Sequence, residues 1–385
     1  MNKKKHLLLH KIVVKVIGSG RRSAISIPIF SVLLSLIAAG IILAILKINP
    51  FSAYYAILQG SGVAPKSAYA AHASMLSVFS GFVNAWTPML FAALAVAVAM
   101  MTGLFNIGVS GQMLFSGFIA TILVGYMEMN SVIAKILVLL IGIVCGALIG
   151  SLIGFLKYKF NINEVVSSIM LNYIVSYIIS FFINTRFVDP VTRQSKNVKK
   201  CARLTLSGVM IGDIKYDIPL GIVLAIAAAV LIYFLMNRTV AGFEMKAVGK
   251  SRTAALYAGV NVGKNVVISM MLSGALAGLA GVTYYLGYFT SIQPKVLPSM
   301  GFDSIAVTLL GNNNPIAIIF SSFVLTVFSK GSTYMSSVTG ADAELASLIT
   351  GFILLFSACN AFIAYKVKKS RDILEEAARE EEKEG

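Results

Sequence analysis

Long runs without Asp, Glu, Lys or Arg dominate the chain. The longest run, Ser67–Met127, contains 61 consecutive uncharged residues. A membrane-spanning helix needs about 20 apolar residues, so these runs are long enough to cross a bilayer. The other uncharged runs are Ser23–Leu46, Ile136–Leu156, Val165–Thr185, Ile218–Asn237, Asn265–Pro294, Ser304–Ser329 and Leu345–Tyr365. A soluble helical core would not sustain so many, and the pattern therefore predicts an all-α polytopic membrane protein.

Two interruptions divide the uncharged runs. The first is GLFNIGVSGQ at 103–112, and the second is LLGNNNP at 309–315, where glycine and proline break a helix. At the second we expect two short half-helices that meet inside the protein. Irregular backbone at membrane depth is tolerated only where it is buried or lines a cavity, and paired interruptions point to a transport site. An ordinary short loop is the alternative for the first, but no charged residue anchors that loop in water. We expect about ten passes in two inverted five-helix halves, 25–185 and 218–366.

The basic residues predict the orientation. The N-terminal segment 1–24 is rich in Lys and Arg, which mark cytoplasmic segments, and its LLLHKIVV stretch suits a short amphipathic interfacial helix. Alternating passes through the transmembrane domain, 25–366, place the loop 238–264 and the charged tail 367–385 inside as well. Both termini then lie in the cytoplasm, which requires an even number of passes and favours ten over nine. The segment 186–215 carries seven Lys or Arg yet falls outside, an exception that long loops tolerate.

Composition supports the membrane assignment and excludes several classes of site. Hydrophobic residues make up 57% of the chain and charged residues 12%, about half the usual charged fraction of soluble domains. The net charge of +16 is attributed to topology and anionic headgroups, so we expect no nucleic-acid partner. The three cysteines and three histidines lack metal-ligand spacing, and no metal or cofactor is expected.

Two short motifs suggest enzymes and fail closer tests. Gly-Lys-Ser at 249–251 ends a phosphate-binding loop only if a glycine lies five residues before Gly249, where this chain has Glu244. GVSG at 108–111 matches an intramembrane serine protease, but no histidine follows residue 72 to act as the general base. Neither ATP hydrolysis nor proteolysis is expected.

Glycines recur every four residues in two of the uncharged runs. They are Gly142, Gly146, Gly150 and Gly154 in one run, and Gly274 and Gly278 in another. Small residues at this spacing let neighbouring helices approach closely. We therefore predict that both stripes serve helix packing.

Four segments resemble the permease subunits of bacterial ABC importers. They are GLFNIGVSGQMLFSG (103–117), NEVVSSIMLNYIVSY (163–177), AVGKSRTAALYAGVNVGKNVVISMMLSGALAGLAG (247–281) and GFDSIAVTLLGNNNP (301–315). The branch that they resemble carries simple sugars, nucleosides and branched-chain amino acids. Within it, nucleoside permeases linked to basic-membrane-protein lipoproteins are most similar. The resemblance covers about residues 25–366, with one departure at Ser110, where the family usually has Glu.

The resemblance implies partners and a coupling site. In the family, the loop corresponding to 238–264 forms a coupling helix that docks on a separate ATPase subunit. The small residues of the family pattern match Gly249, Ala254, Ala255 and Gly259, and the cations Lys250 and Arg252 suit acidic groups on the ATPase. The alternative is a solvated basic loop. A second permease subunit, identical or paralogous, an extracellular substrate-binding lipoprotein and a bacterial plasma membrane are also implied.

The polar groups in the uncharged runs narrow the solute. They are the amides and hydroxyl of Asn106, Ser110, Gln112, Asn172, Asn312 and Asn313. Such groups suit a neutral, hydroxyl-rich solute, a nucleoside first and a simple sugar such as ribose or galactose second. The alternative is that they only cap the broken helices. An ion-coupled secondary transporter and a channel are less favoured, because these runs lack the charges that such pathways use.

Overall fold

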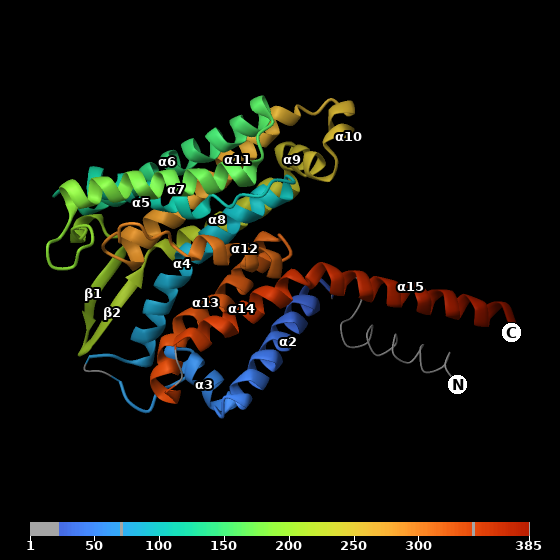
Figure 1. The fold of residues 1–385 in the computed structure, drawn as a ribbon, viewed down its shortest axis with the longest axis horizontal. Helices are drawn as coiled ribbons and strands as arrows, with labels where there is room; N and C mark the ends of the chain where they lie inside the picture. The colour runs from blue at the N-terminus through green and yellow to red at the C-terminus, as the bar shows by residue number, and fades with distance from the viewer. Residues whose placement is uncertain (1–22, 70–71, 341–342, 385) are drawn as a thin grey trace.

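The computed structural model describes residues 23–69, 72–340 and 343–384, and most of them are helical (Figure 1). The amphipathic helix expected near the N-terminus lies outside these residues. The α-helices are α2 (Ser23–Ile45), α3 (Pro50–Gly60), α4 (Met75–Met101), α5 (Val109–Ala120), α6 (Ser131–Phe160), α7 (Glu164–Phe182), α8 (Gly221–Arg238), α9 (Val240–Lys250), α10 (Arg252–Tyr257), α11 (Val262–Thr283), α12 (Met300–Leu310), α13 (Pro315–Thr339), α14 (Ala343–Ala358) and α15 (Asn360–Glu384). The remaining elements are the π-helical turns η2 (Thr121–Gly125), η3 (Ile183–Phe187) and η5 (Tyr284–Tyr288), the 3-10 turn η4 (Lys200–Ala202), and the strands β1 (Thr205–Ile211) and β2 (Ile214–Pro219).

Seven helices among the described residues are long and apolar enough to cross a membrane. They are Ser26–Ile45, Met75–Met101, Ser131–Phe160, Glu164–Phe187, Gly221–Arg238, Val262–Tyr288 and Pro315–Thr339. Shorter apolar helices, Val109–Gly125 and Met300–Leu310, follow α4 and η5 along the chain, and α14 is a further apolar segment. The prediction of an all-α polytopic membrane protein is confirmed. The inverted relation of the two halves stays a prediction.

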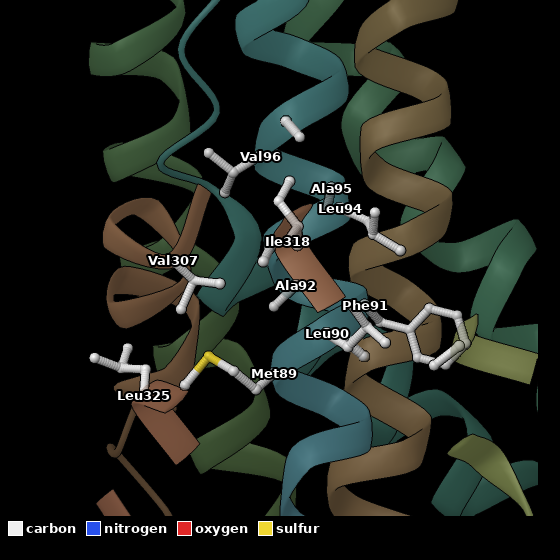
Figure 2. Packing of buried hydrophobic residues seen from close by; sticks show 14 of the residues in the cluster. Met89, Leu90, Phe91, Ala92, Leu94, Ala95, Val96, Val307, Ile318 and Leu325 are labelled. Atoms are coloured by element: carbon white, nitrogen blue, oxygen red, sulfur yellow. The ribbon is translucent and has the colours of Figure 1, made fainter. Parts of the chain in front are cut away.

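Helix α4 forms the centre of the molecule. Its residues Met89–Val98 are buried almost completely, and they pack against α8, α11, α12 and α13. Figure 2 shows Val307, Ile318 and Leu325 from α12 and α13 gathered around this stretch. Because this part of α4 is surrounded by protein, it needs no wide lipid-facing side, and alanine and valine predominate from Ala92 to Ala99.

The two glycine stripes meet between α6 and α11. A Cβ placed on Gly146 would overlap the Gly274 carbonyl oxygen, and one placed on Gly278 would overlap the Gly142 carbonyl oxygen. The helix backbones therefore touch directly, as small residues allow. The packing role predicted for these glycines is confirmed.

The segment between α7 and α8 contains an antiparallel β-hairpin, an element that the sequence analysis did not predict. β1 pairs with β2 through a two-residue Gly212–Asp213 turn, with an irregularity between Leu206 and Val209. The hairpin is attached to the start of α4, since Lys215 N–H donates to the His72 carbonyl at 3.0 Å. Figure 1 shows the hairpin at the end of the molecule opposite α9 and α10.

The second interruption differs from the pair of half-helices that we expected inside the protein. Only α12 is short. Helix α13 has 25 residues and continues past the end of the uncharged run, through Lys330 to Thr339. Between the two helices, Asn312 and Asn313 adopt positive φ angles of 50° and 57°, which asparagine tolerates well. Asn314 caps α13 by accepting a hydrogen bond from Ile316 N–H at 3.0 Å.

Candidate functional site

The first interruption, residues 102–108, is a largely buried non-helical segment between α4 and α5. Asn106 is buried, at 1% exposure, and its side chain forms hydrogen bonds with three neighbouring residues. Its Nδ2 donates to Gln112 Oε1 at 3.1 Å and to Ser273 Oγ of α11 at 2.8 Å, and its Oδ1 accepts from Gly108 N–H at 2.9 Å. Ser273 Oγ in turn donates to the Ala95 carbonyl of α4 at 2.6 Å. These bonds tie the interruption to its neighbouring helices.

Asn172 of α7 completes the support of this segment. Its Oδ1 accepts from Gly111 N–H at 2.9 Å, and its Nδ2 donates to the Ile107 carbonyl at 3.0 Å. Ser110 Oγ donates to the Pro298 carbonyl at 2.9 Å, and Gly301 of α12 packs directly against Ser110. The first turn of α5, directly after the interruption, therefore supports the start of α12.

The structure brings four of the predicted pathway residues together and separates two. The four are Asn106, Ser110, Gln112 and Asn172, and all are buried and hydrogen-bonded to protein. Asn312 and Asn313 lie beyond the other end of α12, where Asn312 is exposed and Asn313 is half-buried. Asn313 Oδ1 is buried without a hydrogen-bond partner among the described residues. The geometry of the four buried residues matches the alternative in which polar groups cap broken backbone.

The predicted coupling residues lie on α9, α10 and the turn that follows. Gly249 and Lys250 end α9, a helix and therefore unlike the strand and loop of a phosphate site. Four of these residues are exposed: Lys250, Arg252, Ala254 and Gly259. Ala255 is buried, at 3% exposure. Exposed Leu256 and Tyr257 stand beside them on α10, at 64% and 89% exposure. Sequence analysis missed these two apolar side chains.

Gly249 faces the protein and contacts the first interruption. A Cβ on Gly249 would overlap the Met101 carbonyl oxygen, and a Cβ on Gly103 would lie 3.0 Å from Gly249 Cα. Gly103 also has a positive φ of 69°, a conformation that favours glycine. The segment that carries the predicted coupling residues thus touches the interrupted segment backbone to backbone.

A cavity of about 480 Å³ lies beside the start of α12. It is bordered by α4, η5, α12, the second half of α13 and the end of α3. Its aromatic side chains are Tyr284, Tyr288, Phe289 and Tyr334. Its hydroxyl side chains are Ser299, Thr326, Ser329, Thr333 and Ser337. The size is that of a typical small-molecule site, which combines apolar surfaces with a few polar groups.

The cavity also contains charged groups, which corrects our expectation that the spans hold none. Asp303 lies in the first turn of α12, and Lys330 lies on α13. Lys330 Nζ donates to the Tyr288 hydroxyl at 2.8 Å and stands 4.8 Å from the centre of the Tyr288 ring. A hydroxyl and an aromatic face compensate part of the cost of this charge at membrane depth. Both residues escaped notice because they lie just outside the ends of the uncharged run.

A second lysine lies at the edge of the cavity, on the loop after α3. Lys66 Nζ stands 4.1 Å from the centre of the Tyr334 ring. Partial burial, and then the charge of Lys330, lower the pKa of the Lys66 ammonium from its ordinary value. Lys66 thus contacts Tyr334, one of the aromatic side chains of the cavity.

The fold and the site define a polytopic membrane transport protein with a solute-sized cavity and a buried helix interruption. The chain belongs to the family described as branched-chain amino acid transport system / permease component, which matches residues 78–358. Members of this family are the non-catalytic membrane subunits of ABC transporters, in which ATP is hydrolysed by a separate subunit and a substrate-binding protein takes part. The family assignment made from the four sequence segments is confirmed.

Relatives with named functions include two nucleoside permeases. The chain is 33% identical over 356 residues to the guanosine ABC transporter permease protein NupP of Bacillus subtilis, covering 91% of this chain and 98% of the relative. It is 30% identical over 294 residues to the nucleoside ABC transporter permease protein NupB of Lactococcus lactis, covering 74% and 80%. The glucose ABC transporter permease protein TsgB13 of Haloferax volcanii is 26% identical over 346 residues, 87% of each chain. No solved structure matches the chain significantly.

Proposed function

We propose that this protein is the permease subunit of an ABC importer for nucleosides. The observation that supports it best is the cavity, which combines four aromatic side chains with five serine and threonine hydroxyls. Aromatic rings stack on a nucleobase, and hydroxyl groups exchange hydrogen bonds with a ribose. The names of two relatives, NupP and NupB, agree with this solute class.

The solute site is therefore the cavity, and the buried amides of the first interruption serve to hold its wall. Asn106, Gln112 and Asn172 are buried and hydrogen-bonded to protein, which suits a role in holding the backbone of the interruption. Ser110 links the interruption to Pro298, one residue before Ser299 of the cavity. Asn312 and Asn313 remain candidates for the cytoplasmic end of the pathway.

The remaining assignments complete the importer. Residues 1–24 and 367–385 flank the transmembrane domain, 25–366, on the cytoplasmic side of a bacterial plasma membrane. The exposed residues Lys250, Arg252, Ala254 and Gly259 contact the ATPase, while Gly249 and Ala255 hold α9 and α10 in place. A second permease subunit, identical or paralogous, completes the pathway, and an extracellular lipoprotein delivers the solute to it.

Uptake by the assembled importer tests the function. The importer, with its ATPase subunit and binding protein, is placed in proteoliposomes and supplied with radiolabelled nucleosides or simple sugars. We expect ATP-dependent import of nucleosides and little import of ribose, galactose or glucose. Import of sugars without nucleosides would make the chain a sugar permease and refute the proposal.

Tyr288→Leu tests the cavity as the site of that uptake. The substitution removes a ring on which a base stacks, which is worth roughly 1–3 kcal/mol per base, so uptake at low solute concentration should fall about tenfold or more. Tyr173→Leu is the matched control, since Tyr173 lies on α7 at 56% exposure and outside the cavity. Equal uptake by the two variants would place the solute elsewhere.

A further inference from the structure

Two groups of opposite charge, Lys330 and Asp303, border the cavity. No ion pair joins them among the residues that the structure describes. Lys330 uses one of its three N–H donors on the Tyr288 hydroxyl, which leaves two for another partner. Asp303 forms no ion pair with the residues that the structure describes, and it lies in the first turn of α12, where the helix dipole offsets part of the cost of a buried carboxylate. Ionisable groups inside a membrane protein are costly and therefore usually functional. Both groups are available to a solute.

The edge of a guanine base presents hydrogen-bonding groups that complement one carboxylate and one ammonium. Its N1–H and 2-amino groups are adjacent donors, which suit the two oxygens of one carboxylate. Its O6 and N7 are adjacent acceptors, which suit an ammonium. Hypoxanthine keeps N1–H, O6 and N7 and lacks only the amino group.

The other common nucleobases match this pair of charges less well. Adenine has an amino donor beside the N1 lone pair, and that lone pair repels a carboxylate oxygen. Cytosine, like adenine, has an amino donor beside a ring nitrogen that acts as an acceptor. Uracil has a single N3–H donor between two carbonyl oxygens, so a bidentate carboxylate would approach one of those oxygens. A site with one carboxylate and one ammonium thus discriminates by the order of donors and acceptors along the base edge.

We propose that Asp303 and Lys330 select 6-oxopurine nucleosides, guanosine first and inosine second, within the cavity between α12 and α13. The Asp303 carboxylate accepts from N1–H and the 2-amino group, and the Lys330 ammonium donates to O6 or N7. Tyr284, Tyr288, Phe289 and Tyr334 supply the faces between which the base stacks. This inference rests on the proposed import of nucleosides and adds the base that the permease itself prefers.

The ratio of guanosine to adenosine import tests the inference. Proteoliposomes contain the complete importer with an unchanged binding protein, so a change in the ratio between variants arises in the permease. Asp303→Asn replaces a double acceptor by an amide, and Lys330→Met removes the ammonium at similar length. Each should lower the ratio about tenfold, because a good bidentate contact discriminates bases by roughly that factor, while adenosine is still imported.

Glu128→Gln is the matched control for a lost charge. Glu128 is exposed, pairs with Lys199 at 2.9 Å and lies away from the cavity, so this variant should keep the wild-type ratio. An unchanged ratio in Asp303→Asn, with both nucleosides still imported, would overturn the inference. So would wild-type import of adenosine and uridine at the rate of guanosine, although nucleoside import itself would then stand.

Base analogues give a second measurement that needs no variant. Once binding protein saturated with each solute is supplied, 1-methylguanosine, which lacks the N1–H donor, should enter wild-type proteoliposomes about tenfold more slowly than guanosine. Inosine should enter at an intermediate rate. Equal rates for guanosine and 1-methylguanosine would refute the role of Asp303. Import of sugars alone would instead refute the nucleoside function on which the inference rests.

Discussion

Gly103 is the residue at which the first interruption meets α9. Its φ is 69°, and a methyl carbon added to it would lie only 3.0 Å from Gly249 Cα, so both the conformation and the space require glycine. Alanine at such a φ costs about 1–2 kcal/mol. At Gly103 the added methyl group would also push α9 away from the interruption.

We therefore expect Gly103→Ala to reduce solute import per ATP hydrolysed while the ATPase subunit still binds. Gly212→Ala is the control, because Gly212 has a φ of 62° and nothing within 4 Å of a Cβ. Both variants carry the same backbone strain, and only the first disturbs the contact with Gly249. Uptake and ATPase rates of the reconstituted importer are measured together. Equal coupling in the two variants would show that the contact does not matter for transport.

A substitution at Asn172 tests whether this buried amide caps the broken backbone or binds the solute. Asn172→Leu keeps the volume and leaves the Gly111 N–H and the Ile107 carbonyl unpaired, at about 1–3 kcal/mol for each buried group. We expect a clear loss of thermal stability in detergent. Asn237→Leu, on an exposed face of α8, should change stability by less than about 1 kcal/mol. A stable Asn172→Leu protein with reduced uptake would instead indicate contact with the solute.

Helix α10 is the element that we propose contacts the ATPase subunit, and it lies at the end opposite the hairpin. It exposes Arg252, Ala254, Leu256 and Tyr257, a mixture of charge and apolar surface that suits an interface. Ala255 is the buried residue of this short helix, so the side that carries Ala255 faces the protein and the other residues face outward.

Ala254→Arg should abolish association with the ATPase and with it ATP-driven uptake, because a long charged side chain would fill the contact. Thr192→Arg, in an exposed loop at the hairpin end, should leave the association intact. Co-purification of the two subunits measures the effect. Normal co-purification and uptake with Ala254→Arg would remove α10 from the interface and favour a merely solvated basic loop.

At the scale of the whole molecule, the predicted orientation rests on the basic segments at its two ends. Lys196 and Lys215 lie in the segment that includes the hairpin, and Lys250 lies at the end of α9, on the opposite end (Figure 1). α15 begins beside the end of α14 and includes the basic cluster before the acidic tail.

We expect single cysteines at 196 and 215 to react with an impermeant reagent from outside intact cells, and cysteines at 250 and 371 to react only after permeabilisation. The native Cys145, Cys201 and Cys359 are replaced first, because none is in a disulfide. A cytoplasmic signal at 196 would contradict the alternation of passes and the inverted halves deduced from it.

The sequence by itself determined the membrane class, the two interruptions and the packing role of the two glycine stripes. These follow from local rules: a bilayer requires long uncharged helices, Gly and Pro end them, and glycines four residues apart lie on one helix face. The four resemblance segments determined the family for the same reason, since each is contiguous along the chain.

Only the tertiary structure decided which polar groups remain available to a solute. Asn106 and Asn172 have the chemistry of a binding site, yet packing against α11 and α5 uses their hydrogen bonds within the protein. Asp303, Lys330 and Tyr288 come from separate parts of the sequence and meet because α12, α13 and η5 converge. Partners of this kind depend on distances between helices, which no local pattern of residues contains.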